Sequence, residues 1–200
     1  MSERVSYYVI LDFEATCDEK RPPRPQEIIE FPSVIIDAST RQIISEFRQY
    51  VKPKHHPELS EFCTQLTGIS QAKVNNGCSV FEAVQRYNKW LAENGLIGDN
   101  FIIITCGNWD LGTMYPAQCK TTGLMPESHF KRWVNIKDEY RDHYGRKSGG
   151  MMSMLEHMGI EHTGRHHSGI DDCRNIAQIW IQLLNEGYQL TENNIYYLGN

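Results

Sequence analysis

Apolar residues along this chain fall into short runs that predict strands. Residues 5–11 (VSYYVIL) and 101–105 (FIIIT) are rich in β-branched and aromatic side chains, which favours buried strands. Residues 26–37 and 42–51 predict two further strands joined by a turn at DASTR, and with the first strand they would form an antiparallel meander. Residues 132–136 (RWVNI) give a weaker strand pattern.

Helical patterns lie between and after these strands. SVFEAVQRYNKWLAENG opens with a capping box from Ser79 to Glu82 and ends at Gly95, which predicts a helix before the FIIIT strand. A helix is also expected over 111–124, and the methionines of GGMMSMLEHMGI have the spacing of helical core residues. Residues 171–188 show the clearest 3.6-residue rhythm. Together these elements predict an α/β domain.

Two acidic residues directly follow the first predicted strand. Because side chains alternate between the faces of a strand, Asp12 and Glu14 point to one side and Phe13 to the other. One metal ion can therefore contact both carboxylates, and oxygen ligands favour Mg²⁺ or Mn²⁺. We expect no cluster of sulfur and imidazole that would compete for zinc. The alternative is an acidic turn exposed to solvent, which the apolar flanks and the acidic residues downstream disfavour.

A third carboxylate, Asp110, follows the FIIIT strand, where open α/β sheets place their sites. Its alternative role is the N-cap of the helix that follows.

His167 and Asp172 border the last predicted helix. Asp171 and Asp172 both fall in its first turn or cap, where the helix dipole favours an ionised carboxylate, so one of the two can be a cap alone. The intervening loop, with Ser168 and Gly169, can place the imidazole of His167 over the same site, where it could accept a proton near neutral pH. The alternative for RHH is a solvated basic loop.

These five groups indicate a two-metal nuclease. Two divalent ions roughly 3.5 to 4 Å apart need several converging negative oxygens, and hydrolysis needs a base for the attacking water. Asp12, Glu14, Asp110 and Asp172 would supply the oxygens, and His167 the base.

The motifs also resemble a known family. The order Asp-x-Glu, Asp, His-x4-Asp is the pattern of the DEDDh 3′-5′ exonucleases. LDFEATC, EIIEFPSV, FCTQLTGI, TCGNWDL and HHSGIDDCRNIA are similar to the enhanced-RNAi/histone-mRNA 3′ exonuclease branch, which includes prion-protein-interacting relatives. The resemblance extends from about Tyr7 to about Tyr188. It implies a ribonuclease H-like, DnaQ-type fold with a mixed central sheet flanked by helices, in a single exonuclease domain over residues 1–200 with a core at about 5–188.

The resemblance also implies roles for individual residues. The four carboxylates match the ligands of two Mg²⁺ ions, for which Mn²⁺ could substitute, and His167 matches the general base. The positions expected at the terminal nucleotide are Phe13, Glu14, Ala15, Thr16, Trp109 and His167, with Leu66, Thr67 and Gly68 packing against its base and ribose. His166 stands where relatives often carry proline, and the segment 144–150 looks shorter than in some of them.

Charge and composition refine the expected substrate. The net charge of −5 is unexpected for an enzyme that binds nucleic acid, because positive side chains normally neutralise the phosphates. Bound metal ions would overcompensate the charge of the four catalytic carboxylates, and small basic clusters remain elsewhere in the sequence. We therefore expect the protein to bind only a few nucleotides at a single-stranded RNA 3′ end or overhang, with bases stacking on Phe13 or Trp109. These two rings could equally be core residues. Protein partners cannot be inferred.

The six cysteines lack the spacing of a zinc site, and the chain begins without a signal peptide, so we expect reduced thiols. No apolar run reaches the length of a membrane span, so we expect no membrane association. The expected location is intracellular, cytoplasmic or nuclear.

Two other functions fit the same residues. A DNA-directed repair or degradative exonuclease would use the same five groups, because ribose selectivity depends on contacts that the sequence does not display. A catalytically weak module that binds RNA ends is the second alternative, although converging carboxylates would repel phosphate and give a pure binder no benefit. The expected reaction releases 5′-mononucleotides from the RNA 3′ end.

Overall fold

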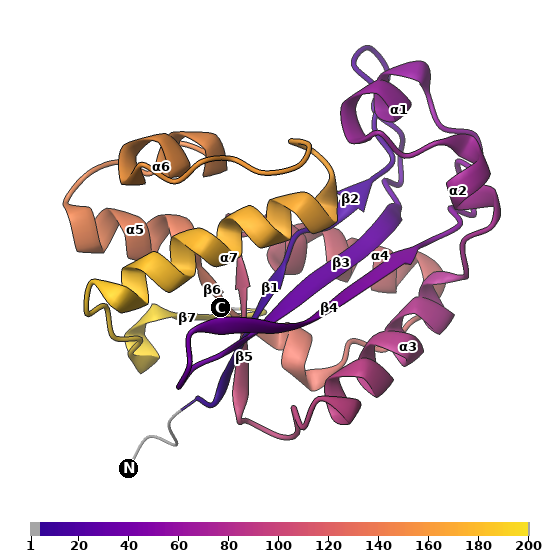
Figure 1. Ribbon diagram of the computed structural model, residues 1–200. Coiled ribbons are helices and arrows are strands. Elements are labelled where there is room, and N and C mark those ends of the chain that lie inside the picture. The colour runs from indigo at the N-terminus through magenta and orange to yellow at the C-terminus, as the bar shows by residue number, and fades with distance from the viewer. Residues whose placement is uncertain (1–4, 200) are drawn as a thin grey trace.

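The computed structural model describes residues 5–199, and its centre is a seven-stranded mixed sheet (Figure 1). The strands are β1 (Tyr7–Leu11), β2 (Glu14–Ala15), β3 (Ile28–Asp37), β4 (Gln42–Tyr50), β5 (Phe101–Thr105), β6 (Arg132–Asn135) and β7 (Ile195–Tyr197). β3 pairs antiparallel with β1, β2 and β4, whereas β1, β5 and β6 run parallel. β7 closes the far edge antiparallel to β6. The predicted meander of the first three strands and the mixed sheet are both confirmed.

The helices are distributed over both faces of the sheet. They are α1 (Glu61–Thr67), α2 (Gln71–Asn75), α3 (Val80–Glu93), α4 (Tyr115–Thr122), α5 (Ile136–Tyr144), α6 (Met151–Met158) and α7 (Gly169–Asn185). Short helical turns of other types are η1 (Asp110–Met114, a π-helix), η2 (Ser128–Lys131) and η3 (Glu192–Asn194). Figure 1 shows α7 lying across β1, β3 and β4, while α3 lies on the opposite side. None of the helices in the described part of the chain is long and apolar enough to cross a membrane.

The alternation of side chains along β1 divides the core into two layers. Val9 and Leu11 pack into the cluster beneath α3 and α4, whereas Tyr8 and Ile10 pack into the cluster beneath α5, α6 and α7. A strand that is covered on both faces has apolar residues at every position, so β1 and β5 can be recognised in the sequence as continuous apolar runs.

Three helices and two short strands were not predicted. α1 and α2 begin at Ser60 and Ser70, whose side chains accept hydrogen bonds from the backbone N–H groups of Cys63 and Lys73. Both helices are too short for a helical rhythm to show. α5 is rich in charged residues, which hides its apolar face in the sequence. The strand predicted over residues 132–136 also included Ile136, which is the first residue of α5.

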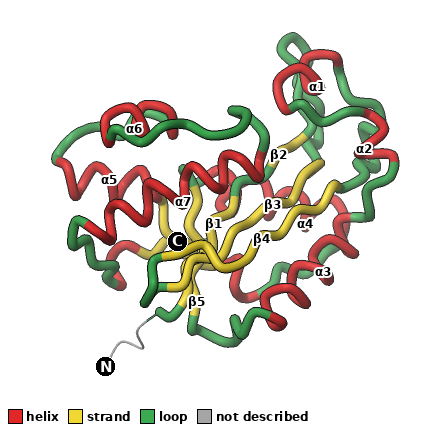
Figure 2. The backbone as a smooth tube through the Cα atoms, in the orientation of Figure 1, coloured by secondary structure: helices red, strands yellow, loops and turns green. Residues whose placement is uncertain are grey.

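The carboxyl ends of the parallel strands define the functional edge of the sheet. β1 and β5 are in register from Tyr7 opposite Phe101 to Ile10 opposite Ile104, so the residues after Leu11 and Thr105 emerge side by side. Figure 2 shows that the loops after β2 and after α6 approach the same region. Ligands of open α/β sheets bind at this kind of edge.

Candidate active site

Asp12 and Glu14 are placed by the end of β1 and by β2. The chain continues alongside β3 after Leu11, so Glu14 lies opposite Glu30. The ring of Phe13 points the other way into the core, where it is only 4% exposed and meets Phe31 edge to face with 4.8 Å between ring centroids. The expected stacking of Phe13 on a nucleotide is therefore wrong, because its ring is already packed inside the protein.

Asp110 is the first residue of the π-helix η1, which continues into α4. The N-cap position belongs to Trp109, so the alternative role of Asp110 as an N-cap is wrong. Its Oδ1 instead accepts a hydrogen bond of 2.8 Å from the backbone N–H of Phe13. This bond holds Asp110 beside the backbone between Asp12 and Glu14.

Asp172 lies in the first turn of α7, and its Oδ2 accepts a hydrogen bond of 2.9 Å from the backbone N–H of His167. His167 adopts a left-handed backbone conformation with φ of 65°. Asp171 turns away from the site and pairs with Arg174 at 2.8 Å. Of the two neighbouring aspartates, Asp172 is the one directed into the site.

Gly169 allows α7 to start this close to β1. A Cβ at this position would lie 2.7 Å from Cγ of Pro32 and 3.0 Å from the backbone oxygen of Asp12. Any side chain would push the first turn of α7, and with it Asp172, away from Asp12.

The carboxylates converge on one point. One oxygen from each of Asp12, Glu14 and Asp172 lies within 4.8 Å of the other two, and Asp110 is linked to the same segment through Phe13. Residues from the start, middle and end of the sequence therefore meet in one place. The role of each residue in catalysis stays a prediction.

The electrostatics of this cluster favour a bound cation. Burial, together with repulsion from the neighbouring carboxylates, raises the pKa of Asp12 well above its usual range and that of Glu14 to about 9. Burial also raises the pKa of Asp110 to about 7 and that of Asp172 to about 6. Oδ1 of Asp172 is buried and has no hydrogen-bond partner among the described residues. Crowded oxygens with an unpartnered buried atom fit a divalent ion, and these acidic residues can hold one.

His167 sits beside this cluster with its imidazole partly exposed. Burial, followed by the positive charges of His166 and Arg165, lowers its pKa from the ordinary value. The ring is therefore neutral at physiological pH and can accept a proton.

A fifth acidic residue, Glu30, was missed by the sequence analysis. It is fully buried opposite Glu14, and its Oε1 accepts a hydrogen bond of 2.7 Å from Nε of Arg48. The available signal was a carboxylate within the otherwise apolar pattern of β3, where burial requires a partner. Its charge adds to the repulsion felt by Glu14.

The end of α1 and the residue Gly68 after it contact the loop that carries His167, through Arg165. The Arg165 guanidinium donates hydrogen bonds to the backbone oxygens of Gln65 and Leu66 at the end of α1. Gly68 adopts a φ of 70°, and a Cβ there would lie 2.3 Å from Nη1 of Arg165. Glycine adopts this backbone conformation without strain and leaves room for the guanidinium of Arg165 against the chain.

The residues expected at a nucleotide differ in how accessible they are. Ala15, Thr16 and Thr67 are buried, and the hydroxyl of Thr67 donates to the backbone oxygen of Cys63 at 2.8 Å. Leu66 and Gly68 are partly exposed, and Trp109 is 40% exposed. Because the ring of Phe13 is buried, Trp109 is the one of these two aromatic residues whose ring is accessible for stacking on a base.

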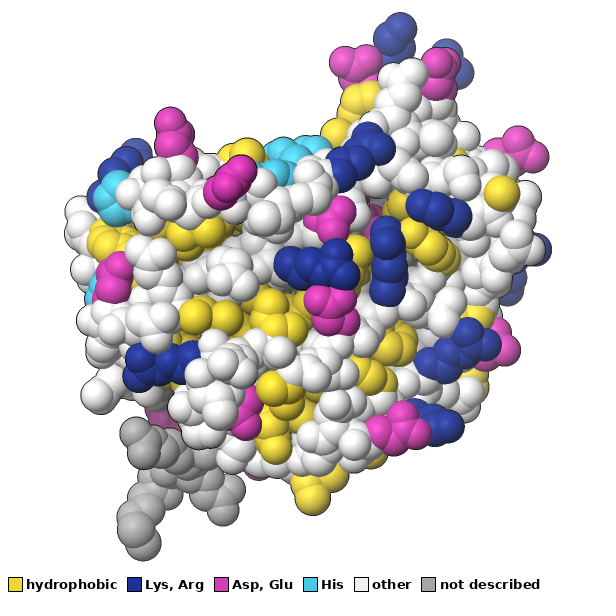
Figure 3. Space-filling view, viewed as in Figure 1, with side chains coloured by type: hydrophobic (Ala, Val, Ile, Leu, Met, Phe, Trp, Pro, Cys, Tyr) yellow, Lys and Arg dark blue, Asp and Glu magenta, His cyan; other side chains and the backbone are white. Residues whose placement is uncertain are grey.

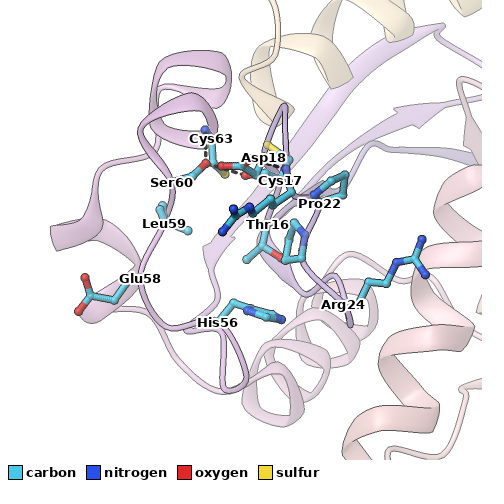
Figure 4. Close-up of a pocket in the computed structure, with 12 residues that line it drawn as sticks. Thr16, Cys17, Asp18, Pro22, Arg24, His56, Glu58, Leu59, Ser60 and Cys63 are labelled. Carbon is cyan, nitrogen blue, oxygen red and sulfur yellow. Dashed lines mark hydrogen bonds between the residues drawn. The ribbon is translucent and has the colours of Figure 1, made fainter.

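A cavity of about 290 Å³ lies next to Thr16 (Figure 4). Figure 4 shows side chains of the loop after β2, including Cys17 and Pro22, facing Leu59 and Cys63 across it. Neither the clustered carboxylates nor His167 line this cavity. All six cysteines of the chain are free thiols, as the sequence predicted.

Comparison with known proteins identifies the family. Residues 9–180 match the family model described as Exonuclease (RNase_T). The chain belongs to this exonuclease family. It is 44% identical over 189 residues to ERI1 exoribonuclease 3 of Homo sapiens, covering 93% of this chain and 56% of that relative. It is 34% identical over 199 residues to the 3′-5′ exonuclease Snipper of Drosophila melanogaster, covering 91% of this chain and 70% of Snipper.

The chain spans about half the length of the ERI1 exoribonuclease 3 proteins that it matches. Among solved structures, the nuclease domain of 3′hExo, a DEDDh family member bound to rAMP, has a TM-score of 0.89 at 34% identity, covering 94% of this chain and 96% of that chain. A 3′-exonuclease described in 3′-end specific recognition of a histone mRNA stem-loop has a TM-score of 0.89 at 30% identity, covering 100% of this chain and 93% of that chain. The resemblance drawn from the motifs and the ribonuclease H-like fold are both confirmed.

Proposed function

We propose that this member of the exonuclease family is a metal-dependent 3′-5′ exoribonuclease that releases 5′-mononucleotides from RNA 3′ ends. The observation that carries this proposal is the convergence of Asp12, Glu14 and Asp172, with Asp110 and His167 beside them. A structure that only bound RNA would gain nothing from buried carboxylates that repel phosphate. Relatives named as exoribonucleases and a neighbour bound to rAMP support RNA as the substrate class.

Asp12, Glu14, Asp110 and Asp172 would hold two Mg²⁺ ions, with Mn²⁺ able to substitute. Bound divalent ions supply Lewis-acid activation of the attacking water and stabilise charge on the leaving oxygen. The donor set agrees with this assignment, because it consists of carboxylate oxygens, which hard ions prefer.

His167 would take the proton of the attacking water. Its imidazole is neutral near pH 7 because burial and nearby positive groups lower its pKa. The hydrogen bond from its backbone N–H to Asp172 fixes the loop, so that the ring stays next to the carboxylates.

The substrate would be a single-stranded 3′ end or overhang held over a short length. On the face seen in Figure 3, basic and acidic side chains are interspersed, with no continuous basic track. The half-exposed ring of Trp109 could stack on a terminal base next to Asp110. We further propose that one exonuclease domain accounts for residues 1–200 and acts in the cytoplasm or nucleus.

The test uses oligonucleotides labelled so that shortening from the 3′ end is visible. RNA and DNA of the same sequence are incubated with the protein and Mg²⁺, Mn²⁺ or EDTA, and each is also supplied with a blocked 3′ end. We expect metal-dependent shortening of unblocked RNA to mononucleotides. Faster shortening of DNA would favour the DNA-directed alternative, and RNA binding without shortening would favour the binding module.

A further inference from the structure

Two neighbouring histidines lie against the last carboxylate of the site. One ring nitrogen from each of His166 and His167 and one carboxylate oxygen of Asp172 lie within 4.8 Å of one another. The two imidazoles are stacked with 3.9 Å between centroids and 19° between planes. In the space-filling view, histidine side chains gather at the surface over the loop that joins α6 to α7 (Figure 3). The sequence analysis considered clusters of sulfur with imidazole and did not identify this pair of imidazoles, which contains no sulfur.

We propose that His166, His167 and Asp172 form a binding site for Zn²⁺ that is separate from the oxygen-only site and shares Asp172 with it. Two imidazoles and one carboxylate, with water in the fourth position, are a donor set typical of zinc. Imidazole donors prefer borderline ions such as Zn²⁺ and Co²⁺, whereas Asp12 and Glu14 offer only hard oxygens. Zn²⁺ would therefore bind between Asp172 and the two histidines, and Mg²⁺ or Mn²⁺ would bind between Asp172 and the carboxylates of Asp12 and Glu14.

Zinc binding requires the ring of His166 to leave its stack on His167, because an imidazole binds a metal through a lone pair in its ring plane and the two ring planes are nearly parallel. Zinc–ligand bonds of about 2.0–2.1 Å place tetrahedral donor atoms roughly 3.3 Å apart, so donor atoms that lie within 4.8 Å of one another would close by up to about 1.5 Å. His166 is exposed at the surface of its loop, which gives its ring room to rotate.

Two buried atoms near this position have no hydrogen-bond partner among the described residues, and one of them, Oδ1 of Asp172, also borders the oxygen-only cluster. Oδ1 of Asp172 is buried without a hydrogen-bond partner among residues 5–199, while Oδ2 is occupied by the N–H of His167. Nε2 of His162 is also buried and unpartnered within the described chain, and the ring of His162 lies 6.2 Å from that of His166.

The nearby guanidinium groups are directed to other partners. Arg165 donates to the backbone oxygens at the end of α1, and Arg174 is paired with Glu46 at 2.6 Å and with Asp171 at 2.8 Å. The charge of Arg174 is compensated by these two carboxylates, whereas the charge of Arg165 is still felt at His167, so zinc would have to bind against it.

Zinc in this site would inhibit the exonuclease. It would occupy the imidazole that serves as the base and one carboxylate of the oxygen-only site. This effect on activity rests on the proposed function, but the binding itself does not.

The test measures zinc binding directly by calorimetry, and Co²⁺ binding by the visible absorption of a four-coordinate ion, both with Mg²⁺ in excess. Wild type is compared with His166→Asn and with a matched surface variant, His55→Asn. The third variant, Asp12→Ala, removes a carboxylate from the oxygen-only site alone. We expect His166→Asn to weaken Zn²⁺ binding at least roughly tenfold, given that loss of even an outer partner of a metal site costs 10- to 100-fold. His55→Asn and Asp12→Ala should bind Zn²⁺ as wild type does.

Several results would overturn the proposal. These are wild-type binding by His166→Asn, loss of binding in Asp12→Ala equal to that in His166→Asn, or no zinc binding by the wild type. In RNA assays with Mg²⁺, we expect His166→Asn to need at least about tenfold more Zn²⁺ than wild type for half inhibition, each protein being compared with its own turnover without zinc. Zinc binding that depends on His166 in a chain without exonuclease activity would uphold this site and refute the proposed function.

Discussion

The backbone N–H of Phe13 donates a hydrogen bond of 2.8 Å to Oδ1 of Asp110, across 97 residues of sequence. Because Phe13 lies between Asp12 and Glu14, this bond ties the segment that carries these two carboxylates to the first residue of η1. The buried ring of Phe13 anchors the same residue from the other side.

Asp12→Ala and Asp172→Asn should each lower RNA hydrolysis by more than about a hundredfold, because each removes a predicted metal ligand. Neither change should lower the melting temperature in EDTA, since burial and repulsion disfavour both ionised carboxylates in the metal-free fold. Turnover is measured with labelled RNA and folding by circular dichroism. Wild-type turnover by either variant would show that the site is misassigned.

His167→Ala should lower the rate by roughly 10²- to 10⁴-fold, the usual contribution of a general base. Mn²⁺ binding, followed by calorimetry, should remain close to wild type, because the four carboxylates stay in place. The variant should also lose the acidic limb of the wild-type pH–rate profile. If the rate falls only in proportion to lost metal binding, His167 acts as a ligand and not as a base.

The metal-free protein should become less stable as the pH rises from 7 to about 8.5. The pKa of Glu14 is about 9 and that of Asp12 is raised well above its usual range, whereas both groups titrate near pH 4 in the unfolded chain. The folded chain therefore binds more protons, so its free energy of unfolding falls as the pH increases. Urea unfolding in EDTA at several pH values measures this slope.

Two additions to that experiment identify its cause. Saturating Mn²⁺ should flatten or reverse the slope, because the ion binds the ionised carboxylates of the folded state. Glu14→Gln should reduce the slope in EDTA. An unchanged slope in this variant would place the titrating groups elsewhere.

Gly68→Ala should raise KM for RNA and lower stability. Gly123→Ala is the matched control, because Gly123 has a φ of 74° and nothing within 4 Å of the added Cβ, whereas Gly68 has a φ of 70° and faces Arg165. Both variants pay about 1–2 kcal/mol for the left-handed backbone. Only Gly68→Ala should also displace Arg165 and change KM. Equal effects of the two substitutions on KM would mean that the contact with Arg165 does not shape the substrate site.

The sequence predicted the elements whose pattern is set by burial alone. β1 and β5 are apolar on both faces, α3 carries a complete capping box, and α7 has a long apolar face. α1 and α2 depend on serine caps and on packing against the start of β3, which no periodicity within five to seven residues can display.

The chemistry was predictable to a similar extent. Asp12, Glu14 and Asp172 were expected to meet because strand ends and a helix start pointed to one edge of the sheet. The contacts of Glu30 with Arg48 and of His166 with His167 depend on cross-strand register and on a left-handed loop residue. A linear pattern of residues contains neither kind of information.

A ribosome synthesises Asp12 and Glu14 before the rest of the site, and of the elements that form the site it synthesises α7, which carries Asp172 in its first turn, last. Until α7 has emerged from the exit tunnel and docked on β1 and β3, the cluster lacks both the carboxylate and the imidazole that we propose as its last ligand and its base. On this proposal, a partly synthesised polypeptide that is still tethered to its own messenger has no complete site with which to attack that transcript.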